Sequence, residues 1–327
     1  MHELRAPIRL SDPNDDAFRR VEFLKNSRTN RRRFGEFFVE GVKPIDQARR
    51  HGWPIRSLVY LGGRPLSSWA RETLAATPDA TRLEVSPALM ARLSDKHHPS
   101  DLVAVVAMPP DEPARIRPRP NTLVAVFDQP SSPGNLGSII RSCHALGADG
   151  LIVTGHGTDV YNPQSVRASM GSLFALPTVR LASAREVRAW VRGAAAPASR
   201  TGTIQIVGAT GDAALTVDAV DLTQPTVLVF GNEAMGLSAQ YRELCDVLVR
   251  IPMHAGADSI NVACAAAVLL YEADRQRRRR PLTGRRAHKE ARRQKKLARE
   301  GERAAARATT PAAPSSAEAE GESKRKP

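Results

Sequence analysis

Residues 123–141 read LVAVFDQPSSPGNLGSIIR, and this stretch decides how the chain should fold. Its apolar start, Leu123–Phe127, is a continuous run typical of a parallel strand covered on both faces. A turn rich in Pro, Ser and Gly follows, and an apolar helical pattern begins near Leu136. Asn135 precedes that pattern, where its side-chain oxygen can cap the helix. A strand that leads through a polar turn into a helix predicts a βαβ unit, and open α/β sheets bind ligands at such strand ends.

The same alternation continues along the second half of the chain. Further candidate strands are Leu151–Val153, Ile204–Gly208, Thr226–Phe230 and Val247–Ile251. Candidate helices are Leu136–Leu146, Pro163–Ser169, Ala184–Arg192 and a last helix that starts at Val262. Strands that alternate with helices indicate a parallel sheet, so residues 121–280 are predicted to form one α/β domain.

A smaller α/β unit is predicted before it, over residues 18–108, from short apolar runs separated by helical patterns. Residues 109–120 contain five prolines and no apolar periodicity, which predicts a stiff linker. The polar residues 1–17 are expected to be disordered. Residues 281–327 are rich in Ala, Arg, Lys and Glu and are expected to form a basic, largely disordered tail.

The positive charge of the chain is concentrated at one end. The 327 residues include 48 Lys and Arg against 34 Asp and Glu, a net charge of +14. Residues 274–327 hold 18 of the basic and only 7 of the acidic residues, so this end carries +11. Such a tail attracts a polyanion without reading its sequence, which favours a nucleic-acid partner. A tail that only improves solubility is the alternative.

Other bulk features limit the location of the protein. No apolar run approaches the roughly 20 residues that a membrane helix needs, and the N-terminal residues lack the apolar segment of a secretory signal. The three cysteines, Cys143, Cys245 and Cys264, show neither close pairing nor metal-ligand spacing. We expect a cytoplasmic protein with reduced cysteines, no metal and no membrane partner.

Two later segments share the polar strand-end pattern. Residues 229–237, VFGNEAMGL, place a glycine, Glu233 and a second glycine directly after an apolar strand. Residues 250–263, RIPMHAGADSINVA, end a strand at a proline and place Ser259 and Asn261 before the last helix, where they can cap it. Each segment alone also fits an ordinary strand-to-helix turn.

In this order and spacing, the three segments resemble the motifs of the SpoU/TrmH family of RNA 2′-O-ribose methyltransferases. Residues 162–174, NPQSVRASMGSLF, match an intermediate family segment, and the resemblance covers about residues 121–275. Residues 35–44, GEFFVEGVKP, are similar to the family's N-terminal RNA-recognition domain. The segments HGWPIR (51–56), SWARE (68–72) and PSSPGN (130–135) are most similar to the avilamycin-resistance branch, whose members methylate a uridine ribose of 23S rRNA.

The resemblance implies an α/β fold with a trefoil-knotted C-terminal methyltransferase domain and a smaller N-terminal RNA-binding domain, in a homodimer with its active site near the subunit interface. It implies S-adenosylmethionine as cofactor and an RNA partner, most specifically 23S rRNA. A tRNA 2′-O-methyltransferase of the same family is an alternative. A non-catalytic RNA-binding or ribosome-assembly protein on this fold is the alternative of another class.

The resemblance also assigns residues. Arg141 corresponds to the catalytic residue, and the other site positions are Asn135, Glu233, Ser259 and Asn261. The cofactor is expected against Gly208, Gly231, Ile251 and Ile260. The first unit would bind RNA phosphates through the basic cluster Lys25, Arg28, Arg31, Arg32 and Arg33, for which a solvated basic face is the alternative. A guanidinium is a poor general base, so we expect Arg141 to hold an RNA phosphate and stabilise negative charge at the 2′-oxygen.

Overall fold

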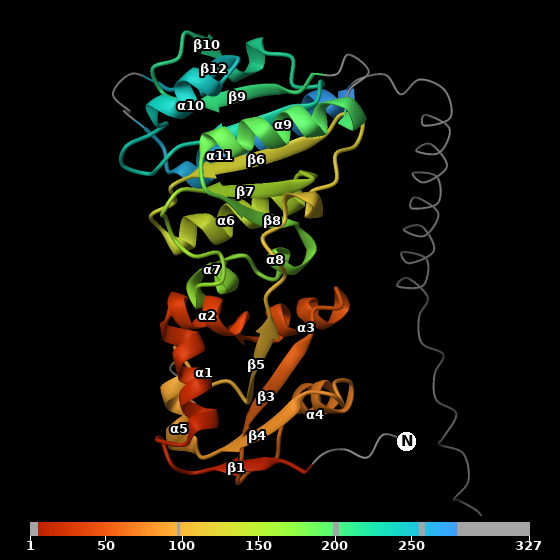
Figure 1. The fold of residues 1–327 in the computed structure, drawn as a ribbon, viewed down its shortest axis with the longest axis vertical. Helices are drawn as coiled ribbons and strands as arrows, with labels where there is room; N and C mark the ends of the chain where they lie inside the picture. Colours follow the sequence, from red (N-terminus) through yellow and green to blue (C-terminus); the bar gives the residue numbers. More distant parts are fainter. Residues whose placement is uncertain (1–5, 97–98, 199–202, 255–258, 280–327) are drawn as a thin grey trace, which may run out of the picture. The chain divides into compact units, whose positions relative to one another are not determined.

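The computed structural model describes residues 6–96, 99–198, 203–254 and 259–279, with only the backbone described at 196–198 and 279 (Figure 1). The tail predicted over 281–327 and residues 1–5 therefore lie outside the described residues. The described part up to Arg277 belongs to one compact unit built on two sheets. None of the helices that the structure describes has the length and apolar character needed to cross a membrane.

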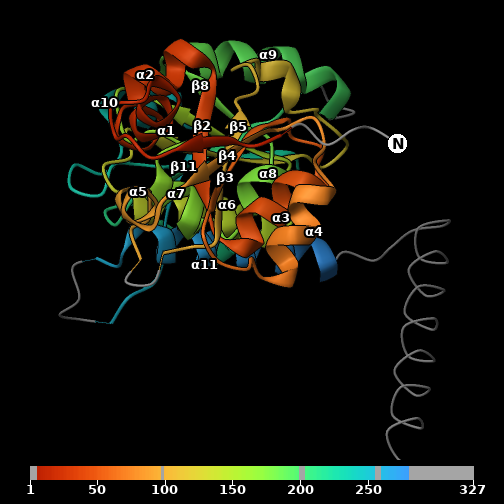
Figure 2. The same ribbon diagram turned by 90° about the horizontal axis from the view of Figure 1, so that it is seen from below.

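The first sheet has five strands in the order β1-β4-β3-β5-β2. The strands are β1 (Ile8–Leu10), β2 (Glu36–Glu40), β3 (Ile55–Leu61), β4 (Thr81–Val85) and β5 (Leu102–Ala107). The helices are α1 (Asp16–Asn26), α2 (Arg28–Phe34), α3 (Val42–Arg50), α4 (Ser68–Ala75) and α5 (Pro87–Leu93). Apolar residues of α1 and α5 pack on one face of the sheet, and those of α3 and α4 pack on the other (Figures 1 and 2).

The N-terminal residues differ from the expectation of disorder over 1–17. Residues 8–10 form β1, which pairs in parallel with β4, and α1 begins at Asp16. Leu10 is buried in the core between α1, α5 and the sheet, and the side chain of Asp15 caps α1 by accepting from the amide of Ala17. The buried side chain of Leu10, the pairing of β1 with β4 and the helix cap all stabilise this otherwise polar segment.

The second sheet has seven parallel strands in the order β10-β12-β9-β11-β6-β7-β8. They are β6 (Leu123–Asp128), β7 (Gly150–Thr154), β8 (Thr178–Leu181), β9 (Gln205–Ala209), β10 (Leu215–Thr216), β11 (Thr226–Phe230) and β12 (Val247–Arg250). The five strands expected from the sequence are confirmed, whereas β8 and β10 are new. Both are edge strands, too short to give a clear apolar pattern.

Helices cover both faces of the second sheet, which explains its continuous apolar strands. The helices are α6 (Pro133–Ala145), α7 (Pro163–Ala168), α8 (Ser172–Ala175), α9 (Ala184–Ala198), α10 (Ala239–Leu244) and α11 (Val262–Arg279). Along β6, Leu123, Ala125 and Phe127 join the core with α6 and α11, while Val124 and Val126 join the core with α9 and α10. The predicted parallel α/β architecture is therefore confirmed.

The segment expected to be a stiff linker is packed against the second sheet. It contains a short 3-10 helix, η1 (Pro113–Arg115), and Ile116 is fully buried next to Gly150. A side chain at position 150 would overlap Ile116. Burial of Ile116 therefore fixes this segment along the sheet, so it is not a free spacer between two separate bodies.

The two sheets also share a core. Phe37 from β2 lies 4.7 Å from Tyr161 and 6.2 Å from Phe174, measured between ring centroids. Trp53 packs edge-on against Phe174 and donates a hydrogen bond from Nε1 to its carbonyl oxygen at 3.1 Å. These aromatic contacts tie the first sheet to the segment that carries α7 and α8.

Candidate functional site

The site lies where the order of the second sheet reverses. From β6 the chain proceeds outward to β7 and β8, and it then returns to the other side, to β9 and β11. The strands β6 and β11 are neighbours, but the chain continues from β6 towards one edge of the sheet and from β11 towards the other edge. Such a switch point at the carboxyl ends of parallel strands is the usual ligand site of an open α/β sheet.

Glu233, in the turn after β11, holds the turn after β6. Its Oε2 accepts hydrogen bonds from the amide and the hydroxyl of Ser131, at 2.8 and 2.7 Å. Its Oε1 accepts from the amide of Ser132 at 2.9 Å and from Nδ2 of Asn135 at 3.1 Å. Four donors on one carboxylate join two segments about a hundred residues apart in sequence, so Glu233 fixes the relative position of these segments.

Asn135 extends this network to the third segment. Its Oδ1 accepts a hydrogen bond from Nδ2 of Asn261 at 3.0 Å, and Asn261 Oδ1 caps α11 by accepting from the amide of Ala263 at 2.8 Å. The expected cap at Asn261 is confirmed. Asn135 does not cap α6, because α6 begins at Pro133 and its N-cap is Ser132, whose hydroxyl accepts from the amide of Asn135. The Asn135 side chain is therefore free to link Glu233 with Asn261.

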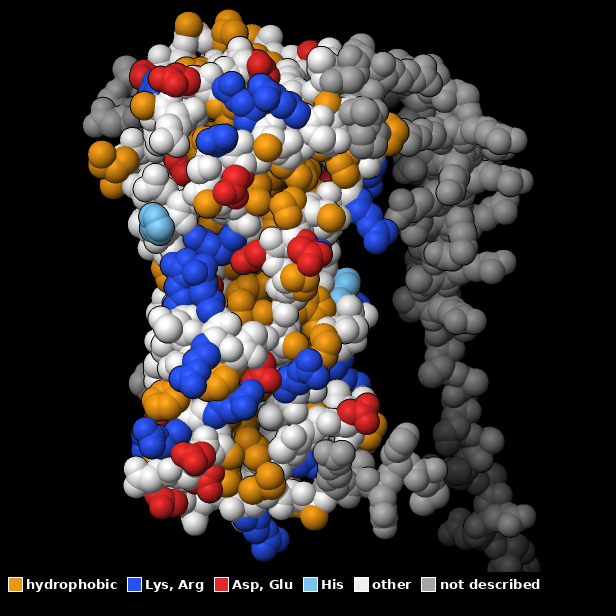
Figure 3. Space-filling view, viewed as in Figure 1, with side chains coloured by type: hydrophobic (Ala, Val, Ile, Leu, Met, Phe, Trp, Pro, Cys, Tyr) orange, Lys and Arg blue, Asp and Glu red, His pale blue; other side chains and the backbone are white. Residues whose placement is uncertain are grey.

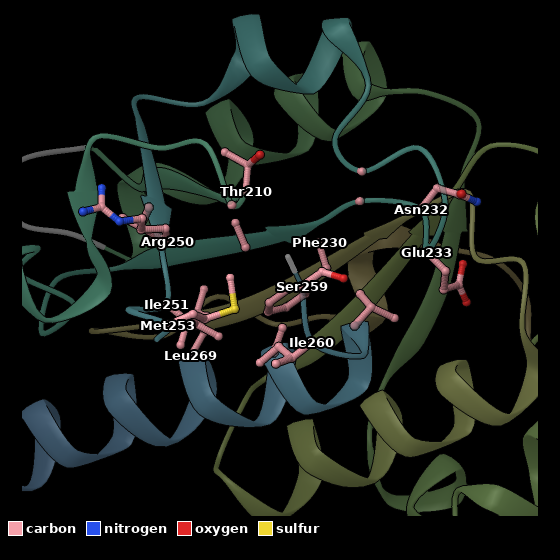
Figure 4. A pocket seen from close by; sticks show the side chains of 17 residues that line it. Thr210, Phe230, Asn232, Glu233, Arg250, Ile251, Met253, Ser259, Ile260 and Leu269 are labelled. Atoms are coloured by element: carbon pink, nitrogen blue, oxygen red, sulfur yellow. The ribbon is translucent and has the colours of Figure 1, made fainter. Parts of the chain in front are cut away.

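The carboxylate of Glu233 is stabilised in its charged form. Burial acts to raise the pKa of Glu233, but the hydrogen bonds donated by Ser131, Ser132 and Asn135 act in the opposite direction, and their combined effect lowers the pKa below its ordinary value. In Figure 4 the carboxylate points away from the neighbouring pocket. Glu233 is thus a fixed acceptor that organises the site, and it is ionised at neutral pH.

We expect the stability contributed by Glu233 to depend on pH. Because its pKa is lowered in the folded state, the contribution is complete above the ordinary pKa of a glutamate and is lost as the pH falls through the lowered value. Glu233→Gln should reduce the free energy of unfolding at pH 7 by about 2 kcal/mol, since a neutral amide replaces a charged acceptor. Urea unfolding of both proteins between pH 7 and pH 3 should show this difference shrinking towards low pH. The exposed control Glu243→Gln should show no such trend, and a constant difference for Glu233→Gln would contradict the assignment.

Arg141 is not part of this hydrogen-bond network. It lies on α6, six residues after Asn135, which corresponds to about 9 Å along the helix. Its side chain is exposed, and among the described residues it has no hydrogen-bond or ion-pair partner. The structure therefore brings together Asn135, Glu233 and Asn261 and leaves Arg141 free at the surface of α6.

A pocket of about 210 Å³ opens beside the network (Figure 4). Of the expected cofactor positions, Gly231, Ile251 and Ile260 line it, and so does the predicted site residue Ser259. Its apolar lining includes Phe230, Ile251, Met253, Ile260 and Leu269, and its polar lining includes Thr210, Asn232, Glu233 and Ser259. Residues 255–258, which connect His254 to Ser259, lie outside the described residues.

Gly208 does not line this pocket, unlike the other expected positions. A side chain at position 208 would lie 2.7 Å from Sγ of Cys245 and 2.8 Å from Leu248, so packing of the sheet accounts for this glycine. The lining residues are the next three, Ala209 to Gly211. The end of β9 was correctly expected to reach the pocket, but the residues that line the pocket follow directly after Gly208.

Gly231 has a specific steric role in the pocket wall. It lines the pocket, and a Cβ at this position would overlap the backbone of Gly236 and the amide of Leu237. Asn232 and Gly236 form a β-bridge with two backbone hydrogen bonds, of 3.0 and 2.9 Å, which closes the turn tightly over Gly231. Only glycine leaves room for this close approach of two backbone segments.

The basic cluster expected to bind RNA separates into buried and exposed members. Arg31 is 3% exposed and forms an ion pair of 2.7 Å with Asp159, so its side chain is not accessible to RNA at the protein surface. Lys25 pairs with Asp95 at 2.8 Å, and Arg28 donates a hydrogen bond to the carbonyl oxygen of Gly157. Only Arg32 and Arg33 are exposed. Charge density in the sequence could not distinguish these roles, because four of the five residues lie in α2, a helix that was not expected.

The sequence also missed residues that build the site. Ser131 and Ser132 supply three of the four donors to Glu233, and Asn232 donates from Nδ2 to the carbonyl oxygen of Gln129 at 2.6 Å. The sequence signal that could have identified Ser131 and Ser132 is their position directly before Pro133. A pair of hydroxyl residues at a helix start provides both a cap and a further hydrogen-bond donor.

Two family models match the chain and together cover most of it. Residues 122–271 match the SpoU rRNA Methylase family, and residues 15–104 match the SpoU L30e-like domain. The 23S rRNA (uridine(2479)-2'-O)-methyltransferase of Streptomyces viridochromogenes is 49% identical over 261 residues, which are 80% of this chain and 90% of that protein.

Solved structures agree with these matches. The SpoU methyltransferase AviRb from Streptomyces viridochromogenes, in complex with the cofactor AdoMet, is 48% identical with a TM-score of 0.76 and covers 81% of this chain and 99% of its own. An AdoMet-bound rRNA methyltransferase from Sinorhizobium meliloti is 29% identical with a TM-score of 0.72 and covers 82% of this chain and 97% of its own.

Proposed function

We propose, from the premise that this chain belongs to the SpoU rRNA methylase family, that it is an S-adenosylmethionine-dependent methyltransferase that modifies a ribose 2′-hydroxyl of 23S rRNA. The observation that supports this most is the convergence of three strand-end segments through Glu233, Asn135 and Asn261, beside a pocket at the switch point of the sheet. The trefoil knot implied by the family resemblance stays a prediction.

The pocket suits the proposed cofactor. Ile251, Met253, Ile260 and Leu269 provide an apolar wall for an adenine ring, and Thr210 and Asn232 add polar groups at the edge. The cofactor supplies a methyl group bound to a positively charged sulfur, which is the electrophile of the reaction. Glu233 contributes to binding indirectly, because it holds the turn after β11 in place.

We propose that the chain contributes mainly orientation and charge. Attack on the methyl group requires the ribose oxygen to be in line with it, and fixed positioning of reactants accounts for several kcal/mol of barrier reduction. Arg141, which is exposed and unpaired among the described residues, would bind an RNA phosphate and stabilise the negative charge that develops on the 2′-oxygen. Asn135 and Asn261 would orient the ribose, with Ser259 at the edge of the pocket.

Gly231→Ala provides a test of the pocket that does not alter any charge. The added methyl group forces the turn closed by Asn232 and Gly236 to move, so we expect a loss of about 2 kcal/mol of stability. We also expect S-adenosylmethionine affinity to fall at least tenfold, measured by calorimetry. Gly211→Ala is the matched control, because Gly211 lines the same pocket and a Cβ there meets no atom within 4 Å. Equal affinities for the two variants would contradict the assigned cofactor site.

We further propose a homodimer that uses α11. Cys264, Val268 and Tyr271 are exposed and lie at intervals of four and three residues, so they form one apolar stripe on this helix. Ile260, which lines the pocket, is 41% exposed just before the same helix. Covering this stripe with a second copy would place the site near the subunit interface. Sedimentation of the wild type and of Val268→Glu should show a dimer and a monomer, respectively.

The two sheets form two parts of the compact unit, and we assign each part a separate role. We propose that residues 18–108 bind the RNA and residues 121–280 carry out methyl transfer, in the cytoplasm where a ribosomal RNA substrate is present.

Incubating the purified protein with labelled S-adenosylmethionine and with naked 23S rRNA, ribosomal subunits or tRNA tests the substrate. We expect label in 23S rRNA. Label in tRNA alone would favour the other branch of the family, and S-adenosylmethionine binding without transfer to any RNA would favour a non-catalytic role.

A further inference from the structure

Residues 155–159, the first part of the loop between β7 and α7, receive arginines from both parts of the compact unit. Arg28, at the start of α2, donates from Nη1 to the carbonyl oxygen of Gly157 at 2.8 Å. Arg180, in β8 of the second sheet, donates to the carbonyl oxygens of Gly155 and Thr158. The two guanidinium groups are therefore held on the same five residues of the loop by backbone oxygens, which carry no net charge.

The positive charge around this loop is not balanced. Arg32 lies one turn after Arg28 on α2, is exposed, and has no ion-pair partner among the described residues. Two carboxylates act on the cluster: Asp159, which is already paired with Arg31, and Asp111, which is exposed and accepts a hydrogen bond from the amide of Arg180. Three guanidinium groups thus lie close together with no carboxylate paired to them.

The electrostatics of the arginines agree with this imbalance. Burial lowers the pKa of Arg28, and the charge of Arg32 lowers it further. Burial likewise lowers the pKa of Arg180, followed by the charges of Arg28 and Arg32. In addition, Nε of Arg28 is buried and has no acceptor among the described residues. Figure 3 shows Lys and Arg side chains gathered on this face of the molecule, near the level of α2 and α7.

The loop also contacts the segment that carries the site. The amide of Thr158 donates to the carbonyl oxygen of Pro130 at 2.6 Å, and its hydroxyl donates to the carbonyl oxygen of Ser131 at 2.9 Å. Ser131 in turn donates to Glu233. Two hydrogen-bonded steps therefore connect Thr158 of this loop with the carboxylate that organises the site. An anion bound by the arginines would lie next to the same loop.

We propose that Arg28, Arg32 and Arg180 form a composite site for a backbone phosphate of the RNA substrate, over the loop 155–159. This inference rests on the proposed function, because it assumes that the substrate is RNA. The two parts of the compact unit both contribute arginines, so one phosphate would engage both and fix the RNA relative to the methyl-transfer site. Planar guanidinium groups suit this task, because their N–H groups match the spacing of phosphate oxygens.

The salt dependence of RNA binding tests the site. Arg32→Gln/Arg180→Gln should make the slope of log affinity against log salt concentration shallower by about 0.7 to 0.9, which corresponds to the loss of one phosphate contact. Between 50 and 200 mM salt, the double variant should therefore lose about threefold less affinity for transcribed 23S rRNA than the wild type. Because Arg180 anchors the loop, the single variant Arg32→Gln, whose side chain is exposed, should show about half of this change in slope. The control Arg188→Gln removes an exposed arginine of α9 and should leave the slope unchanged.

Two further measurements separate the possible outcomes. Calorimetry with S-adenosylmethionine and methylation of 23S rRNA by the wild type report on the proposed function itself. If the wild type binds the cofactor and methylates RNA while Arg32→Gln keeps the wild-type slope, the phosphate site is rejected and the proposed function stands. Inorganic phosphate, compared with chloride at equal ionic strength, tests a free anion. Stabilisation of the wild type and not of Arg32→Gln by phosphate, without a change in RNA slope, would assign the site to a small anion and overturn the RNA proposal.

Discussion

Replacing Arg141 by lysine is expected to lower the methylation rate at saturating RNA by at least a hundredfold. Lysine keeps the positive charge but loses the planar group that donates two parallel hydrogen bonds to a phosphate and stabilises charge on a neighbouring oxygen. The loss of one such stabilising donor commonly costs a factor of about 100 to 1,000 in rate. Because Arg141 is exposed and has no partner among the described residues, the fold should be unaffected.

The expected result for Arg141→Lys can be separated from trivial causes. The melting temperature and the affinity for S-adenosylmethionine should match those of the wild type, since Arg141 contacts neither the hydrogen-bond network nor the pocket. Arg192→Lys, the same exchange at an exposed position of α9, should retain full activity. Single-turnover methylation of 23S rRNA is the measurement, and near-normal turnover of Arg141→Lys would reject the role assigned to this residue.

Breaking the ion pair between Arg31 and Asp159 is expected to destabilise the protein by about 3 to 5 kcal/mol, the usual cost of leaving one charge of a buried pair without its partner. Both side chains are almost fully buried, at 3% and 7% exposure, and Arg31 also donates to the carbonyl oxygens of Leu24 and Lys25. Arg31→Met should therefore lower the unfolding midpoint in urea strongly. It should also reduce methylation, because Asp159 belongs to the loop that contacts the turn after β6.

A double variant distinguishes the buried charge from simple loss of packing. Arg31→Met/Asp159→Leu removes both charges, and it should be more stable than Arg31→Met alone, because no unpaired carboxylate remains in the interior. Arg33→Met is the matched control: Arg33 is exposed, lies 5.5 Å from the ring of Phe34, and should cost less than 1 kcal/mol when replaced. A double variant as unstable as the single one would show that Asp159 is not the source of the effect.

The part of the site that could be predicted is the part encoded by local pattern. Apolar runs that end in polar turns located the ends of β6, β11 and β12, and spacing alone was sufficient because carboxyl ends of parallel strands meet at one edge of a sheet. The identity of the partners was not accessible in this way. The cap of α6 is Ser132 instead of Asn135, because the helix begins at Pro133. What the local pattern does not contain is the partner of the Asn135 side chain, the distant Glu233.

The basic cluster shows a second limit of the sequence. Arg31 and Arg32 are adjacent and chemically identical, yet one is buried against Asp159, 128 residues later, and the other faces solvent. That difference depends on how the first sheet packs against the second, which no local pattern contains. Gly208 is similar, since its neighbour Cys245 comes from another part of the chain. Long-range packing therefore determines which residues of a correctly located segment line the pocket or face solvent.

Nucleoside analysis of the RNA product is the most direct test of the activity. Unmodified 23S rRNA would be incubated with the purified protein and S-adenosylmethionine carrying an isotopically labelled methyl group, then digested and separated by mass spectrometry. We expect the label in one 2′-O-methylated nucleoside, at a stoichiometry close to one methyl group per RNA, and labelling at least a hundredfold slower with Arg141→Lys. Label on a base, or no label in 23S rRNA although the cofactor binds, would contradict ribose methylation by this site.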